Sequence, residues 1–320
     1  MARLLSSVRT NSRRVWVNRW ARWSLIGLLA LMAVVYVFIS YMIASGVTVA
    51  ERKEQDDNPS NYGVVYEEVR FRSRDEEVTL EGWHIPAQGG APTIIFVHGL
   101  NSQRTADGAV DLAARLHQTG YGALLFDLRG QGLSEAARVS AGYFEQEDVL
   151  GALDYLMSRG VAAEKVGLLG FSMGAATALL AASQEPRIWA VVADSPFANA
   201  SDRLSDETAR RTIIPAYMAP MFLPMAKLFA QGLYDISIGD VSPERAVRSL
   251  DYPILVIHGD ADTRIPIEQG RRVHRAAPAG SKIWIAPGAD HVDAFNNYPD
   301  EYVRRVESYF EERLGGRSPA

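Results

Sequence analysis

The pattern that most constrains this fold is an alternation of short apolar runs with longer helical stretches from Pro92 onward. Six short, mostly apolar runs have the length of strands, at 93–97, 123–127, 165–170, 188–193, 254–257 and 282–285. Between and after them, helices are predicted at 105–119, 144–159, 173–184, 266–276 and 299–313, with Ser102 and Asp300 as caps. Parallel strands need crossover helices that cover both faces. The alternation therefore predicts an α/β fold with a mostly parallel sheet.

A second constraint is the uncharged segment 23–50, which lies between Arg22 and Glu51. As a helix its 28 residues would reach about 42 Å, more than the roughly 30 Å hydrocarbon core of a bilayer. A cleaved signal peptide normally has a shorter apolar stretch, although a cleavage site near 44–46 or at Ala50 remains an alternative. We therefore expect a single transmembrane anchor.

The charges on either side of this segment predict its orientation. Residues 1–22 carry six arginines and no acid, so a net charge of −5 for the chain leaves −11 for residues 23–320. Cationic flanks stay on the cytoplasmic side. We expect a cytoplasmic tail at 1–22 and the remaining chain on the extracytoplasmic side. Membrane lipid is an expected partner of the anchor, with Trp16, Trp20 and Trp23 on one helix face at the headgroups.

The rest of the chain divides into a short linker, one large domain and a tail. Residues 51–63 are polar and charged, which predicts a tether, and 64–71 with 77–84 predict an opening hairpin of a domain that covers 64–314. Residues 315–320 form the C-terminal tail. The acidic balance disfavours nucleic acid as a partner, and the absence of cysteine excludes disulfides and a thiol nucleophile.

The strongest chemical signal is Gly170-Phe171-Ser172-Met173-Gly174, which fits the pattern G-x-S-x-G. In this pattern the serine lies on a sharp turn from a strand to a helix, where glycines allow the neighbouring backbone to come close. The predicted strand 165–170 ends at the motif and a helix rich in small residues follows. Ser172 is therefore the predicted nucleophile.

A serine nucleophile needs a base that is oriented by an acid. Among six histidines, His291 alone follows the last predicted strand on a loop, whereas His98 and His258 precede glycines in strand-end turns. Asp262 follows strand 254–257 and gives the chain order serine, acid, histidine. Asp194 and Asp260 remain alternatives for the acid, and Asp290 adjoins the histidine.

The remaining elements of such a site are oxyanion donors, and the backbone N–H groups of Leu100 and Met173 are predicted for this role. The segment 127–132 is interpreted as a structural turn with an internal pair of Asp127 and Arg129, because a third glycine for a phosphate loop is missing. No Walker loop, H-E-x-x-H or EF-hand pattern occurs, so we expect no cofactor and no metal.

The segments VHGLNSQR, DLRGQGLSE, GFSMGAA, DSPF, HGDADTRIP and GADHVDAF, in this order, resemble the α/β-hydrolase superfamily over residues 64–314. The chain looks most like the membrane-anchored branch described as serine aminopeptidase-like or bem46-like hydrolases. The resemblance implies a Ser172, Asp262 and His291 triad with Leu100 and Met173 as the oxyanion hole. The loop His98-Gly99-Leu100 lacks the extra glycines of the H-G-G-G lipases and esterases.

The resemblance also implies that the insertion 198–250 is a helical lid. Its segment 214–229 holds three methionines and two phenylalanines between three prolines, an adaptable apolar surface. Helices that simply pack on the sheet are the alternative. The predicted activity is hydrolysis of an ester or thioester with an apolar acyl group, through an acyl-enzyme. A short peptide substrate, acyl transfer to another acceptor and a non-catalytic binding module remain as other hypotheses.

Overall fold

The computed structural model describes the backbone of residues 2–315 and the side chains of residues 19–315. Its centre is an eight-stranded sheet with the order β1-β2-β4-β3-β5-β6-β7-β8. The hairpin strands β1 and β2 run antiparallel to each other and β2 runs antiparallel to β4, whereas all other pairs are parallel. The strands are β1 (Glu67–Arg72), β2 (Thr79–Ile85), β3 (Thr93–Val97), β4 (Gly122–Phe126), β5 (Val166–Phe171), β6 (Val191–Asp194), β7 (Leu255–Gly259) and β8 (Lys282–Ala286).

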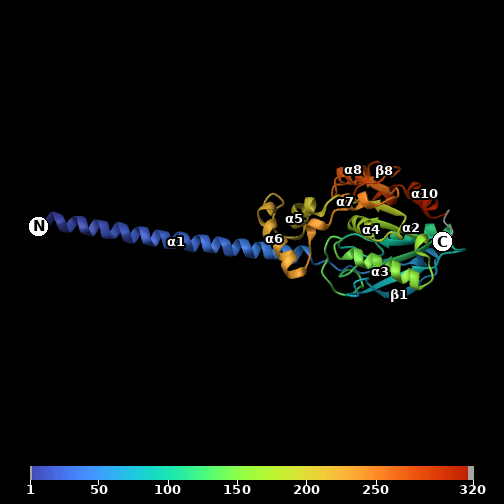
Figure 1. The fold of residues 1–320 in the computed structure, drawn as a ribbon, viewed down its shortest axis with the longest axis horizontal. Coiled ribbons are helices and arrows are strands. Elements are labelled where there is room, and N and C mark those ends of the chain that lie inside the picture. The colour runs from blue at the N-terminus through green and yellow to red at the C-terminus, as the bar shows by residue number, and fades with distance from the viewer. Residues whose placement is uncertain (1, 316–320) are drawn as a thin grey trace.

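Helices cover both faces of this sheet, as the alternation predicts (Figure 1). One face packs against α3 (Glu145–Ser158), α4 (Met173–Gln184) and α8 (Ile267–Ala276), and the other against α2 (Ala109–Gln118), α9 (Ala294–Asn297) and α10 (Pro299–Phe310). The central strands β3, β4, β5 and β6 are buried at every residue. Strands of this kind form continuous apolar runs, which explains why the sequence pattern is so clear.

The predicted strands all coincide with observed ones, with ends that differ by up to three residues, but both predicted helix caps are wrong. Helix α2 begins after Gly108, whose φ of 72° is left-handed, so Ser102 lies in the loop before it. Helix α10 begins at Pro299, which places Asp300 inside the first turn. A proline is favoured at the first helical position, because its fixed φ suits the helix and it lacks an N–H that would be unpaired there.

The N-terminal helix α1 runs from Ala2 to Val47 and projects from the globule as a long rod (Figure 1). Within the described residues, it is the one helix long and apolar enough to cross a membrane, over Arg19–Val47. Its side chains are largely exposed up to Phe38, and Trp20 and Trp23 are among them. Trp16 and the arginines before Arg19 lie outside the residues whose side chains are described.

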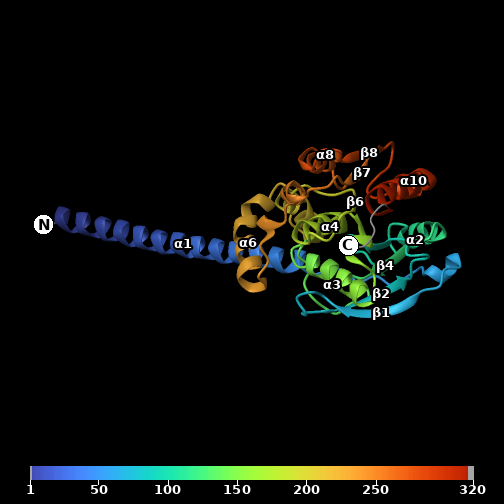
Figure 2. The same cartoon turned by 45° about the vertical axis from the view of Figure 1, so that its right-hand side comes forward.

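The end of α1 packs against two helices of the 198–250 insertion. Helices α5 (Leu204–Arg211) and α6 (Ala219–Tyr234) lie beside α1 where it meets the globule, as both views show (Figures 1 and 2). Ile43 and Ala44 of α1 form an apolar cluster with Phe222 and Ala226 of α6. We call residues 36–47 of α1, the following Thr48, and helices α5 and α6 together the cap. The other short elements are α7 (Pro243–Ala246), five 3₁₀ segments and a π-helical turn at Glu311–Gly315.

The predicted tether 51–63 lies against the large domain and is bound to it by hydrogen bonds. The Glu51 N–H donates to Asn101, Gln103 donates to the carbonyl of Glu54, and the hydroxyl of Thr105 donates to Asp56 at 2.8 Å. Asn58 then caps a 3₁₀ turn at Pro59–Tyr62. The polar and charged composition of 51–63 predicts a solvated linker, but residues of this segment form hydrogen bonds to the loop after β3.

Candidate active site

Ser172 lies on the sharp turn between β5 and α4, as its motif predicts. Its backbone has φ 54° and ψ −116°, a left-handed conformation that costs a non-glycine residue free energy. The turn requires glycine at positions 170 and 174, because backbone atoms occupy the space that a Cβ would need there. A Cβ on Gly174 would lie 2.0 Å from the carbonyl oxygen of Val97, and one on Gly170 would lie 2.4 Å from that of Gly174. The motif thus presents the serine hydroxyl above the carboxyl edge of the sheet.

His291 and Asp262 lie next to this hydroxyl. His291 Nε2 is 2.8 Å from Ser172 Oγ, and His291 Nδ1 is 2.8 Å from Asp262 Oδ2. The three side chains come from three different strand ends, after β5, β7 and β8. All three are mostly shielded from solvent. The arrangement has the hydrogen-bond connectivity of a nucleophile, a base and an orienting acid.

The rival acids lie elsewhere. Asp194 is fully buried and accepts hydrogen bonds from Ser195 Oγ and Tyr302 Oη, each at 3.0 Å. Burial raises the pKa of Asp194 to about 6, against the opposing effect of these two hydroxyls. Asp260 accepts from the Gly288 N–H, and Asp290 accepts from the N–H groups of Thr263 and His291. These acids shape the loops that carry Asp262 and His291.

Asp262 has a second partner, His258, which the sequence places in a strand-end turn. His258 Nε2 lies 3.4 Å from Asp262 Oδ2 and 2.8 Å from the carbonyl oxygen of Ile265. Burial acts to raise the pKa of Asp262, but hydrogen bonds from His258 and His291 outweigh it and hold the pKa well below its usual range. The signal that could have revealed this contact is the i, i+4 spacing of His258 and Asp262 across a tight loop.

The two predicted oxyanion donors lie beside Ser172. Met173 is the first residue of α4, where a backbone N–H has no partner within the helix. Leu100 follows Gly99, and a Cβ on Gly99 would lie 3.3 Å from Ser172 Cβ, so this loop passes directly over the serine. Leu100, Met173 and Ser172 all line the same cavity. The positions suit donors for an oxygen that develops negative charge next to the nucleophile.

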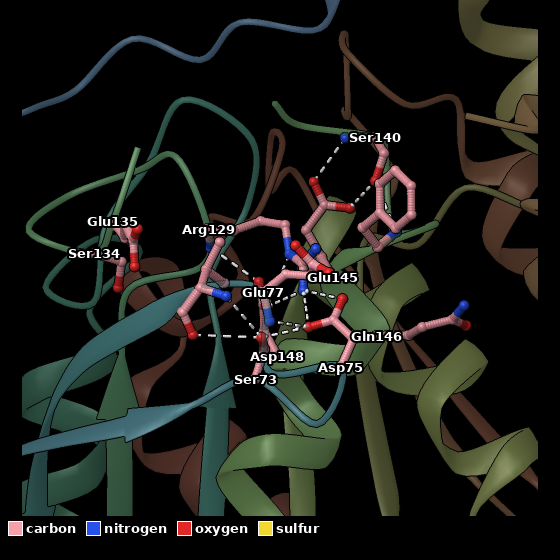
Figure 3. Close-up of polar contacts among 12 residues, drawn as sticks. Ser73, Asp75, Glu77, Arg129, Ser134, Glu135, Ser140, Glu145, Gln146 and Asp148 are labelled. Carbon is pink, nitrogen blue, oxygen red and sulfur yellow. Dashed lines mark hydrogen bonds and ion pairs between the residues drawn. The ribbon is translucent and has the colours of Figure 1, made fainter. Parts of the chain in front are cut away.

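The predicted pair of Asp127 and Arg129 is wrong. Asp127 forms a buried ion pair with Arg104, at 2.8 Å from Nη2, and also accepts from the Arg104 N–H. Arg129 pairs instead with Asp148 of α3 and with Asp75 of the opening hairpin, at 2.7 and 3.0 Å (Figure 3). The two residues are close in sequence, but each is bound by a different neighbouring segment.

The Arg129 network supports one wall of the site. Burial raises the pKa of Asp148 to about 7, although Arg129 opposes this shift. Beside it, Glu145 accepts from the Ser140 N–H at 2.7 Å and from the Ser140 hydroxyl at 2.6 Å (Figure 3). His98, whose pKa is lowered by burial, accepts from the Leu128 N–H at 3.0 Å. These bonds hold the loop that brings Val139 to Ala141 to the cavity.

The cavity in front of Ser172 is mostly apolar. It is lined by side chains of the sheet loops, the insertion and α1, among them Leu100, Val139, Phe197, Leu223, Ala226, Ile43, Ala44 and Val47. Charged residues also line it, including Arg203, Glu207 and Arg211. Within the described residues, no group of three or more His, Cys, Asp or Glu side chains could hold a metal ion. The cavity therefore suits an apolar group that ends next to the serine.

This chain is similar to several known proteins. The family described as serine aminopeptidase, S33, matches residues 91–233. The protein YqkD of Bacillus subtilis is 26% identical over 239 residues, which cover 72% of this chain and 75% of YqkD. The lysophosphatidylserine lipase ABHD12 of Danio rerio is 24% identical over 252 residues, 70% of this chain and 62% of that protein.

Among solved structures, the Pyrococcus furiosus esterase Pf2001 aligns with a TM-score of 0.66 at 26% identity. The alignment covers 84% of this chain and 99% of the esterase. The sheet order and this likeness show an α/β-hydrolase fold, and the matches to a hydrolase family and to an esterase show that the chain is a hydrolase.

Proposed function

We propose that this protein is a membrane-anchored serine hydrolase that cleaves carboxylic esters or thioesters of an apolar acyl group. The observation that carries the proposal is the chain of 2.8 Å contacts from Ser172 through His291 to Asp262, next to an apolar cavity. The esterase Pf2001 and the lipase ABHD12 among the similar proteins support an ester as the substrate.

In the proposed mechanism, Ser172 Oγ attacks the carbonyl carbon while His291 Nε2 takes the hydroxyl proton. The negative charge moves to the carbonyl oxygen, where the N–H groups of Leu100 and Met173 stabilise it. His291 then returns the proton to the leaving alcohol or thiol as the bond to the carbonyl carbon breaks. Water attacks the acyl-enzyme by the same route and releases the acid. Asp262 stays ionised throughout and stabilises the imidazolium.

The anchor is part of the proposal. Segment 23–50 spans the membrane once, residues 1–22 are cytoplasmic, and the domain 64–314 faces the extracytoplasmic side, because cationic flanks stay in the cytoplasm. Protease added to intact cells or spheroplasts should digest a C-terminal tag; protection of the tag would contradict this orientation.

A fluorophosphonate probe tests the nucleophile. We expect the full-length wild type to be labelled, Ser172→Ala to be unlabelled, and Ser201→Ala, a partly exposed serine of the insertion, to be labelled like the wild type. Equal labelling of Ser172→Ala would refute the assignment. Turnover of aminoacyl amides without turnover of p-nitrophenyl esters would instead support the peptide hydrolase that the family description suggests.

A further inference from the structure

We infer that the end of the membrane anchor is a wall of the acyl-binding cavity, and that the substrate is a lipid ester whose chain enters from the bilayer. This inference rests on the proposed function and specifies its substrate class and the source of the substrate. It follows from three features of the cap: the cavity lining, the crossing of α1 by α6, and the outward face of α6.

The first feature is the cavity lining. Ile43, Ala44 and Val47 of α1 line the same cavity as Ser172, and Ile43 and Ala44 are almost completely buried. Leu223 and Ala226 of α6 line it as well. The helix that contains the candidate span therefore does more than tether the domain. An acyl group bound at Ser172 would lie against its last turns.

The second feature is the depth at which α6 meets α1. Tyr36 stacks on Phe222 with ring centres 5.6 Å apart, and Tyr41 meets Phe229 edge to face at 5.8 Å. At about 1.5 Å per residue, Tyr36 lies roughly 10 Å back from Ile43 along α1. About 20 residues cross the hydrocarbon core itself, so within segment 23–50 a crossing that starts at Trp23 ends at Met42 and leaves 43–50 at the outer surface. The contacts of α6 thus lie within the outer part of the span.

The third feature is that α6 is apolar on both sides. Ala219, Phe222, Ala226 and Ala230 are buried, as expected for a packed helix face. The other side exposes Met221, Leu228 and Leu233, and Leu228 is 62% exposed. Lys227 is the one charged residue among the sixteen of α6. A helix with this outer face, next to a membrane span, suits the interfacial region of the bilayer better than water.

Hydrogen bonds hold this arrangement in place. Arg211 of α5 donates to the carbonyl of Val47 at 2.6 Å and also to that of Val49. Arg138 donates to Thr48 Oγ1 at 2.7 Å, and the Val139 N–H donates to the Thr48 carbonyl. The last residue of α1 and the two residues after it are thus bound by two segments that line the cavity. These bonds fix the end of α1 against the cavity lining, so in the inferred arrangement the cavity lies at the membrane surface.

The test uses full-length protein in phosphatidylcholine vesicles and two esters. One is a glycerol monoester of oleate incorporated in the vesicles, and the other is p-nitrophenyl acetate in water. We expect wild type to hydrolyse both. Met221→Asp/Leu228→Asp should lower the ratio of oleate to acetate hydrolysis at least fivefold, because the outer face of α6 no longer suits the bilayer. Val65→Asp, at an exposed position before β1, should keep the ratio of wild type.

A second pair of variants tests the wall itself. Ala44→Trp should lower the same ratio at least tenfold by filling the cavity, whereas Ile26→Trp, exposed on the free part of α1, should not change it. Labelling by a short fluorophosphonate shows whether the site of Ala44→Trp is still assembled. If it is not, the result of the Met221 and Leu228 double variant decides the inference. A wild type that hydrolyses acetate but not the vesicle ester, or an unchanged ratio in the α6 double variant, overturns the inference. Absence of both hydrolysis and labelling overturns the proposed function and the inference with it.

Discussion

The carboxyl edge of the sheet and the cap meet at one cavity, but they are built in opposite ways. At the edge of the sheet, Ser172, His291 and Asp262 are held by buried strands and by glycines whose Cβ positions are occupied by backbone. In the cap, α6 has an exposed apolar side and Gly232 has no atom within 4 Å of where its Cβ would lie. The comparison suggests that the sheet determines the chemistry, whereas the cap determines which substrate reaches it.

The largest expected effect is on the chemical step at the sheet edge. Ser172→Ala or His291→Ala should lower kcat for p-nitrophenyl acetate by at least about 10⁴-fold, because these residues act as a unit. Steady-state kinetics with both variants, and with the double variant, measure this. The double variant should be no worse than either single one; additive losses would contradict a shared relay.

The next largest effect is on stability, when a glycine of the sheet edge and a glycine of the cap are each replaced by alanine. Gly174→Ala should destabilise the protein by about 2–4 kcal/mol, because its Cβ would lie 2.0 Å from the Val97 carbonyl oxygen. Gly232→Ala, with open space around it in α6, should stabilise by about 0.5–1 kcal/mol. Urea unfolding of the full chain in detergent measures both. If Gly174→Ala costs nothing, the sheet edge is not as tightly packed as described.

A third prediction concerns the buried Asp194 below the His291 loop. Its pKa of about 6 exceeds the roughly 3.9 of an unfolded aspartate, so the folded state binds the proton more tightly. Its contribution to stability is therefore fully present below about pH 4 and lost as the pH rises to about 6. Asn cannot ionise, so the free energy of unfolding of Asp194→Asn, relative to that of wild type, should rise by up to about 3 kcal/mol between pH 4 and 7.

Asp290 is the matched control for this pH dependence. It is an exposed aspartate at the same edge, and hydrogen bonds from the Thr263 and His291 N–H groups lower its pKa. The contribution of Asp290 to stability is present at neutral pH and is lost as the pH falls. The free energy of unfolding of Asp290→Asn relative to wild type should therefore fall between pH 4 and 7, opposite to that of Asp194→Asn. Urea unfolding at pH 4 and 7 distinguishes the two. If the difference in free energy of unfolding between Asp194→Asn and wild type does not vary with pH, burial does not raise the pKa of Asp194.

The smallest effect is expected at His258, which contacts Asp262 but not Ser172. His258→Gln should lower kcat about tenfold, or about 1.4 kcal/mol, and leave KM near the wild-type value, because Asp262 loses one partner that positions it. His274→Gln, on α8, is the control and should change neither constant. A rise in KM with constant kcat would show that His258 serves substrate binding instead.

The sequence predicts the sheet and the position of the candidate residues well, and for a physical reason. Buried parallel strands are continuous apolar runs, and the carboxyl ends of adjacent strands meet at one edge. The motif around Ser172 and the loops that carry Asp262 and His291 could therefore be placed together before their geometry was known.

The partners of buried charges and the role of the anchor could not be predicted in the same way. Arg104 and Asp127 pair across 23 residues, and Arg129 pairs with Asp148 in place of its sequence neighbour. Neither contact leaves a periodic signal. The contact of α1 with α6 joins segments about 180 residues apart, and an apolar run predicts burial or a membrane without specifying a partner.

The most direct test of this division between sheet and cap is inactivation of the full-length protein in vesicles by two alkyl fluorophosphonates, one with a short and one with a long chain. We expect both to modify Ser172, as identified by mass spectrometry of the labelled peptide, and the long chain to react at least tenfold faster in wild type but not in Ala44→Trp. Labelling at another residue would contradict the chemistry assigned to the sheet edge. Equal rates for the two chain lengths in wild type would contradict the role assigned to the cap.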